Sequence, residues 1–273
     1  MKSIVATYLC ALSFVSILPF CGGGIDRPSI KDLGLGEVTY QADDGVRIVA
    51  SWAVPEGVAT PPVVMLLHER DGTRAQWDES RLIGILVENG YAVLAPDLRG
   101  FGESNIVVRD GREEPYELTN SADTVLDVKA AIDWLKGQSE VDASRIGIVG
   151  SRLGADLAYT STAAFPEVQA AVAISPDAFN PDDLDPLFAI PDFCAHHVFF
   201  MAGSRPAWEA AATLGVRVDH VGGDRYEDRS DLDGVALLTI DQPIKDILTW
   251  FETRVLATPA PTKPTPRACT PGQ

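Results

Sequence analysis

The chain has 273 residues, of which 46% are hydrophobic and 22% charged, a balance that fits a globular domain with a full core and excludes a largely disordered chain. Its 22 Lys and Arg stand against 39 Asp and Glu, a formal net charge of -17. A surface so acidic repels nucleic acid and anionic membrane faces, so neither is expected as a partner.

The first 20 residues predict an export signal, because Lys2 supplies a positive start and an apolar stretch too short for a typical membrane span follows it. Cys21 then precedes a glycine run, a place where bacterial lipoproteins are cleaved and acylated, although Phe20 is larger than the residue usual before such a cysteine. Lipidation at Cys21, plain secretion and a retained membrane helix all stay open. A lipid anchor is the only membrane contact expected, and residues 21–36 form a spacer.

Two short strands are predicted next, over 37–41 and 47–53, joined by the turn Asp43-Asp44-Gly45 into an antiparallel hairpin. The apolar run 63–67 then predicts a strand covered on both faces. Helices and strands alternate from there. Helices are predicted over 76–89, 122–138, 154–164, 207–214 and 244–256, and strands over 91–95, 145–149, 170–175, 198–202 and 216–221.

This alternation implies right-handed crossovers and an α/β fold of three layers, with a mostly parallel sheet covered on both faces. One domain is expected over residues 37–256. Residues 257–273 are rich in Pro and Thr and are expected to form a disordered tail. Whether Cys194 and Cys269 pair is left open, and neither a metal nor a cofactor is predicted.

Five segments follow predicted strands or contain them: Leu66-Leu67-His68-Glu69, the run from Gly90 through Asp97-Leu98-Arg99-Gly100-Phe101-Gly102-Glu103-Ser104, Ile146-Gly147-Ile148-Val149-Gly150, Ile174-Ser175-Pro176 and Met201-Ala202-Gly203. Together they resemble the α/β-hydrolase superfamily, and within it the dienelactone-hydrolase-like serine hydrolases. The resemblance implies an α/β-hydrolase fold and a catalytic triad: a nucleophile after the fifth strand of the family's sheet, an acid after the seventh and a histidine after the eighth. It also places His68 in the oxyanion loop.

All three implied triad positions are substituted. The nucleophile would stand at the centre of Gly150-Ser151-Arg152-Leu153-Gly154, where a G-x-S-x-G elbow needs a small residue on either side, and the centre is Arg152. A guanidinium stays protonated and cannot attack a carbonyl. Pro206 stands where the acid aligns, and Asp233 stands where the histidine aligns. Because a triad works as a unit, the sequence predicts a hydrolase fold without standard catalysis.

Three hypotheses follow. The first is an exported, non-catalytic protein that binds a small anionic ligand through Arg152, with Leu153, His68 and Glu69 around it, because a helix N-terminus and an arginine both favour anions. The second is a weak esterase that recruits Ser151 and His220, although Val149 and Leu153 would then crowd the elbow. The third is a structural or partner-binding module with a collapsed pocket. An ion pair between Glu69 and Arg152 is expected, the loop 105–120 is expected to cover the pocket, and protein partners are unknown.

Overall fold

The computed structural model describes residues 35–177, 195–215, 218–226 and 231–257. The predicted export signal, Cys21, Cys194 and the tail from residue 258 on lie outside the described residues. Within them, ten strands form one mixed sheet in the order β10-β9-β8-β7-β3-β4-β2-β5-β6, with β1 paired to β2.

The predicted opening hairpin is present as β1 (Gly36–Gln41) and β2 (Val46–Ala53), which pair antiparallel. The other strands are β3 (Pro62–Leu67), β4 (Ala92–Pro96), β5 (Ile106–Arg109), β6 (Arg112–Pro115), β7 (Asp142–Ser151), β8 (Val168–Ile174), β9 (Ala195–Ala202) and β10 (Val218–Arg225). From β4 through β3, β7, β8 and β9 to β10, every neighbouring pair is parallel. Their carboxyl ends therefore meet at one edge, which is where open α/β sheets place their sites.

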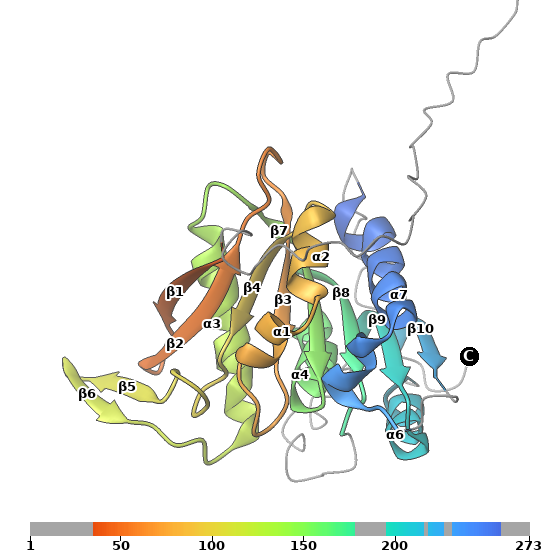
Figure 1. Cartoon of the computed structure of the whole chain (residues 1–273). Helices are drawn as coiled ribbons and strands as arrows, with labels where there is room; N and C mark the ends of the chain where they lie inside the picture. The colour runs from red at the N-terminus through yellow and green to blue at the C-terminus, as the bar shows by residue number, and fades with distance from the viewer. Residues whose placement is uncertain (1–34, 178–194, 216–217, 227–230, 258–273) are drawn as a thin grey trace, which may run out of the picture.

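Helices cover both faces of the sheet, as Figure 1 shows. One face packs against α3 (Val125–Lys136), α4 (Leu153–Ala164) and α6 (Arg205–Gly215). The other packs against α1 (Ala75–Glu79), α2 (Leu82–Glu88), the 3-10 helix η4 (Gly234–Thr239) and α7 (Asp241–Phe251). A 3-10 turn η2 (Ser121–Thr124) leads into α3, and a π-helical turn η5 (Glu252–Leu256) follows α7. These layers confirm the predicted three-layer α/β fold.

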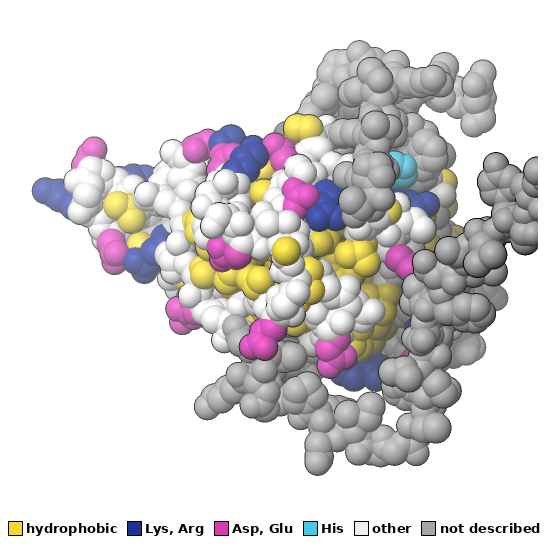
Figure 2. All heavy atoms as spheres, turned by 90° about the horizontal axis from the view of Figure 1, so that it is seen from above, with side chains coloured by type: hydrophobic (Ala, Val, Ile, Leu, Met, Phe, Trp, Pro, Cys, Tyr) yellow, Lys and Arg dark blue, Asp and Glu magenta, His cyan; other side chains and the backbone are white. Residues whose placement is uncertain are grey.

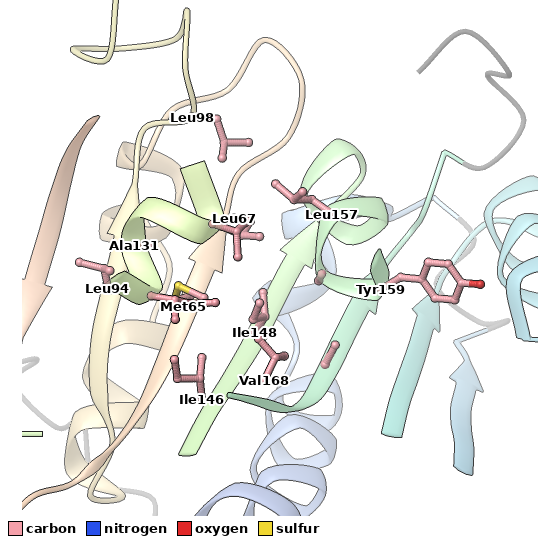
Figure 3. Packing of buried hydrophobic residues seen from close by; sticks show 14 of the residues in the cluster. Met65, Leu67, Leu94, Leu98, Ala131, Ile146, Ile148, Leu157, Tyr159 and Val168 are labelled. Atoms are coloured by element: carbon pink, nitrogen blue, oxygen red, sulfur yellow. The ribbon is translucent and has the colours of Figure 1, made fainter. Parts of the chain in front are cut away.

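The central strand β3 shows why the sequence gives two cores. All six of its residues are buried. Successive side chains of a strand point to opposite faces, so Met65 and Leu67 join the core under α3 and α4, whereas Val64 and Leu66 join the core under α2 and α7. Figure 3 shows Met65 and Leu67 among the neighbouring core side chains. A continuous apolar run therefore marks a strand covered on both sides.

The helix predicted over 76–89 is in fact two short helices, α1 and α2, separated at Ser80 and Arg81. The break lies at Ser80, whose backbone is extended with ψ 154°. The Ser80 hydroxyl donates to the Trp77 carbonyl oxygen at 2.8 Å and accepts from the Leu82 N–H at 3.3 Å. Such local bonds from serine compete with helical backbone bonds, and the apolar periodicity alone did not reveal this.

The loop 105–120 was expected to cover the pocket, and this was wrong for its first half. Residues 106–115 form the β5–β6 hairpin, which extends the sheet beyond β2 at the edge opposite β10. Figure 1 shows the hairpin projecting away from α4 and β7. Alternating Ile106-Val107-Val108 and a turn at Asp110-Gly111, where both residues have positive φ, favour this hairpin over a cover.

The segment 97–104 that carries the resemblance acts as a scaffold. The Asp97 carboxylate accepts from the backbone N–H of Arg74 at 2.7 Å and of Glu103 at 3.0 Å. Arg99 is almost fully buried, and its Nε lies 2.8 Å from Asp127 Oδ1. The hydroxyl of Ser104 accepts from the Val49 N–H at 2.9 Å. These bonds fix the loop after β4 to the β1–β2 hairpin and to α3.

Acidic and basic side chains lie next to one another, with apolar side chains between them, on the face that Figure 2 presents. None of the helices in the described part of the chain is both long and apolar enough to cross a bilayer.

Candidate functional site

Arg152 occupies the apex of a tight turn between β7 and α4. Its backbone has a positive φ of 50° with ψ -111°, which is costly for a residue that carries a Cβ. Two glycines make the turn possible. A Cβ on Gly150 would lie 1.8 Å from the Gly154 carbonyl oxygen, and a Cβ on Gly154 would lie 2.0 Å from that of Leu67. This is the geometry of a nucleophile elbow, with arginine at the nucleophile's position.

The Arg152 guanidinium faces two carboxylates. Its Nε lies 3.6 Å from Glu69 Oε2, which confirms the predicted ion pair, and its Nη1 lies 3.3 Å from Asp177 Oδ1. The side chain of Arg152 is 38% exposed. Two hollows formed by described residues lie elsewhere, one of about 390 Å³ against α6 and β10 and one of about 310 Å³ beside Val54 and Val87. Neither hollow contains Arg152, so its guanidinium is ion-paired at a surface position that is partly open to solvent.

Glu69 connects four parts of the chain through its carboxylate. Its Oε1 accepts from the Ser151 hydroxyl at 2.9 Å and from the Val235 N–H at 2.9 Å, while Oε2 faces Arg152. The bond to Val235 requires the chain to pass close by at Gly234, where an added Cβ would lie 2.3 Å from Oε1. Glu69 thus links the loop after β3, the end of β7, the start of α4 and the start of η4.

Ser151 is the last residue of β7 and is fully buried. Its hydroxyl donates to the Glu69 carboxylate and to no imidazole among the residues that the structure describes. His220 is the third residue of β10, near the amino end of that strand. At about 3.3 Å per residue, the five residues from His220 to Arg225 span roughly 16 Å. The backbone of His220 therefore lies toward the amino ends of the parallel strands, whereas Ser151 lies at their carboxyl ends.

His68 is fully buried and is held by two backbone groups. Its Nδ1 lies 2.7 Å from the Glu69 carbonyl oxygen, and its Nε2 accepts from the Leu98 N–H at 2.8 Å. Only a neutral ring protonated on Nδ1 satisfies both bonds. Burial lowers the pKa of His68, which agrees with the neutral form. His68 therefore fixes the loop that presents Glu69, through bonds to the backbone of Glu69 and Leu98.

The loop after β3 is the one in which the resemblance places an oxyanion donor. In an α/β-hydrolase, one oxyanion donor is a backbone N–H from the loop after the third strand, and the other belongs to the residue after the nucleophile. Here the Glu69 N–H donates to Oε1 of Gln76 at 3.3 Å. Leu153, which follows the apex, is buried as the first residue of α4.

Asp233, which the resemblance aligns with the family's histidine, connects the loops that follow β8 and β9. Its Oδ1 accepts from the Ser175 hydroxyl at 2.8 Å, from the Ser204 N–H at 3.1 Å and from the Gly203 N–H at 3.3 Å. Burial raises the pKa of Asp233, but the hydrogen bonds from Ser204, Ser175 and Gly203 outweigh burial and hold it below its usual value. Asp233 is thus an ionised acceptor.

Pro206, which the resemblance aligns with the family's acid, is the second residue of α6 and is exposed. Proline is well suited to the first turn of a helix because the missing N–H has no intrahelical partner there. The structure thus gathers Arg152, Ser151 and Glu69 into one cluster and Asp233 beside it, and leaves Pro206 as a helix start.

Sequence reasoning missed Asp177 and Ser175 as parts of this cluster. The Ser175 hydroxyl accepts from the Gly234 N–H at 2.9 Å while donating to Asp233. A signal was available, since Ser175-Pro176-Asp177 directly follows β8 and therefore lies at the carboxyl edge of the sheet. No group of three or more His, Cys, Asp or Glu suited to a metal ion is found among the residues that the structure describes.

The fold and this elbow define a protein of the α/β-hydrolase class. An esterase of Pyrococcus furiosus has a TM-score of 0.62 at 20% identity, with 81% of this chain and 94% of that chain covered. The 2,6-dihydroxy-pseudo-oxynicotine hydrolase has a TM-score of 0.63 at 17% identity, covering 85% and 70%. Likenesses at such low identity show the fold.

The family is shown by its model: the dienelactone hydrolase family matches residues 48–209, and the chain belongs to that family. A putative carboxymethylenebutenolidase of Methylorubrum extorquens is 26% identical over 175 residues, 63% of this chain and 59% of that protein. An uncharacterised protein of Mycobacterium tuberculosis is 32% identical over 123 residues, 45% of this chain and 39% of that protein. The chain thus spans well under two thirds of the length of these relatives.

Proposed function

We propose that this protein is a dienelactone hydrolase family member that does not hydrolyse esters and that binds a small anion, such as a carboxylate, through Arg152. The observation that carries the proposal is the guanidinium at the apex of an intact elbow, 38% exposed and faced by two carboxylates.

The loss of catalysis is supported at each catalytic role. Arg152 cannot be deprotonated to a nucleophile, and Ser151 beside it is buried against Glu69. Asp233 cannot replace the histidine as a base of suitable pKa, because its pKa is held low. A carboxylate at Glu69 would also repel the oxyanion that forms during ester cleavage.

Anion binding is supported by charge and geometry. Arg152 stands at the N-terminus of α4, a helix of 12 residues, where the helix dipole also favours negative charge. A guanidinium presents parallel N–H donors that match both oxygens of a carboxylate. The contacts of Arg152 with the Glu69 and Asp177 carboxylates support this choice of ligand.

The first test is hydrolysis of p-nitrophenyl acetate and butyrate by the folded domain, with a fluorophosphonate label for reactive serines. We expect neither turnover nor label, and none from Arg152→Ser, because a serine at the apex would still have no base. Turnover and labelling that survive Arg152→Ser but vanish in Ser151→Ala would overturn the proposal and favour the competing hypothesis, an esterase with Ser151 as nucleophile.

Binding is tested separately by calorimetric titration with benzoate as the probe. We expect saturable binding by the wild type and its loss in Arg152→Leu, with Arg205→Leu as a control, because Arg205 is also exposed and paired only locally with Glu209. Absence of binding by the wild type would overturn the anion site and favour a purely structural or partner-binding role.

Export belongs to the same proposal, with residues 1–20 as the signal and Cys21 as the lipidated residue. Its support is the sequence pattern alone. Expression of the full chain with Cys21→Ala, compared with the wild type by fractionation and by incorporation of a labelled fatty acid, tests it. A label that remains in Cys21→Ala would contradict lipidation at this residue.

A further inference from the structure

The two carboxylates that face Arg152 are held very differently. Glu69 accepts from Ser151 and Val235 in addition to its contact with Arg152, and its side chain is 23% exposed. Among the described residues, Asp177 accepts one hydrogen bond, from Arg152 Nη1 at 3.3 Å, and its side chain is 44% exposed. Within the described part of the chain, Glu69 is therefore held by several groups, whereas Asp177 is held by the guanidinium.

The backbone supports this difference. Ser175 is fixed by its bonds to Asp233 and Gly234 and has a positive φ of 50°. Asp177 follows two residues later, beyond Pro176, so its carboxylate can leave the guanidinium without disturbing the bonds of Ser175. The contact between Asp177 and Arg152 links two side chains that are each more than a third exposed. Contacts of this kind shift an equilibrium by about fivefold at most.

We propose that Asp177 is an exchangeable internal carboxylate that occupies the Arg152 site until an external carboxylate displaces it. The inference rests on the proposed function, because it names the group with which an external anion competes. A ligand carboxylate takes the Nη1 side of Arg152, Asp177 turns toward solvent, and Glu69 stays in place on Nε. No covalent bond changes.

The surrounding charges bear on this exchange. Partial burial raises the pKa of Asp177 above its usual value, Arg152 and Arg70 only partly offset this, and Glu69 adds to it. The contact with Arg152 therefore does not fully compensate the Asp177 carboxylate for the water that it loses, and the carboxylate regains hydration when it turns toward solvent.

The test is benzoate titration of the wild type, Asp177→Asn and Glu209→Gln by calorimetry. Asp177→Asn removes the internal competitor, and we expect the Kd for benzoate to fall about two- to fivefold. Glu209→Gln makes the same change of charge at a carboxylate paired with Arg205 on α6, and we expect its Kd to stay within about 1.5-fold of the wild type. Thermal unfolding of each variant confirms that it is folded.

The outcomes separate the two proposals. Equal Kd values in the wild type and Asp177→Asn would overturn the exchange while leaving the anion site intact. Absence of binding in both would overturn the exchange and the anion site together. Tighter binding by Asp177→Asn that persists when Arg152→Leu is added would place benzoate elsewhere and would also overturn the exchange.

Discussion

The hydroxyl of Ser151 donates to Oε1 of Glu69 at 2.9 Å, so the serine next to the elbow apex is bound to a carboxylate of the oxyanion loop. Ser151 comes from the end of β7, and Glu69 follows β3. In the sheet these strands are neighbours, and Leu67 pairs with Gly150. The contact therefore results from the register of β3 and β7, and its loss should lower the free energy of unfolding.

Replacing Glu69 should destabilise the fold. In Glu69→Ala the buried Ser151 hydroxyl and the Val235 N–H lose their acceptor, and we expect the free energy of unfolding to fall by about 2–4 kcal/mol. Glu69→Gln keeps an acceptor oxygen and should cost about 1 kcal/mol or less. Urea unfolding of both variants measures the difference. Equal losses would mean that charge, and not hydrogen bonding, is what Glu69 contributes.

Gly154→Ala should prevent the elbow from forming. Its Cβ would lie 2.0 Å from a backbone oxygen of β3, and neither strand nor helix can retreat without losing core contacts. We expect a loss above about 4 kcal/mol or failure to fold. Gly36→Ala is the matched control, because its nearest atom would be 3.9 Å away, and it should stay within about 0.5 kcal/mol. Similar stability of the two variants would disprove the crowded elbow.

The stability of the protein should depend on pH through His68. Burial lowers its pKa in the folded state, so below its unfolded pKa, about 6.5, the unfolded chain binds a proton that the folded chain does not. The contribution of His68 is therefore full above about pH 6.5 and is lost as the pH falls toward the folded pKa, with a slope of up to about 1.4 kcal/mol per pH unit. Urea unfolding from pH 7.5 to 5.5 should show this slope, and His68→Gln should reduce it. An unchanged slope in the variant would assign it to other groups.

Asp233 should also affect the stability of the protein, in a more acidic pH range than His68. Its folded pKa lies below its usual value, so it stabilises the fold above about pH 3.9 and loses that contribution as the pH falls through the folded pKa. At pH 7, Asp233→Asn should lower the free energy of unfolding by about 1–2 kcal/mol, because it weakens three hydrogen bonds to a charged acceptor. Asp231→Asn is the exposed control, for which a comparable loss would contradict this role.

Much of the fold could be predicted from residues near in sequence. The apolar run of β3, the turn of the opening hairpin and the glycines of the elbow are local signals, and each predicted its element. The break at Ser80 was not predictable in this way, because it depends on one hydroxyl bond in an otherwise helical pattern. The β5–β6 hairpin was taken for a cover because the position of a loop depends on which strand it pairs with.

The cluster at the elbow was predicted in part. The ion pair between Glu69 and Arg152 was predictable, because both residues follow neighbouring strands at their carboxyl ends and carry opposite charges. Asp177 was missed although it closely follows β8, because the direction of its side chain depends on the turn after β8 and on the positive φ of Ser175. Likewise, the hydrogen bonds of Asp233 with Ser175 and Ser204 require the residue before η4 to lie beside the ends of β8 and β9.

The elbow keeps its shape through Gly150 and Gly154, which lie on either side of the residue it presents. The packing that bends the chain is thus independent of the apex side chain, and residue 152 is held outward whatever it is. A different side chain at position 152 would therefore leave the strand, the helix and the core beneath them in place.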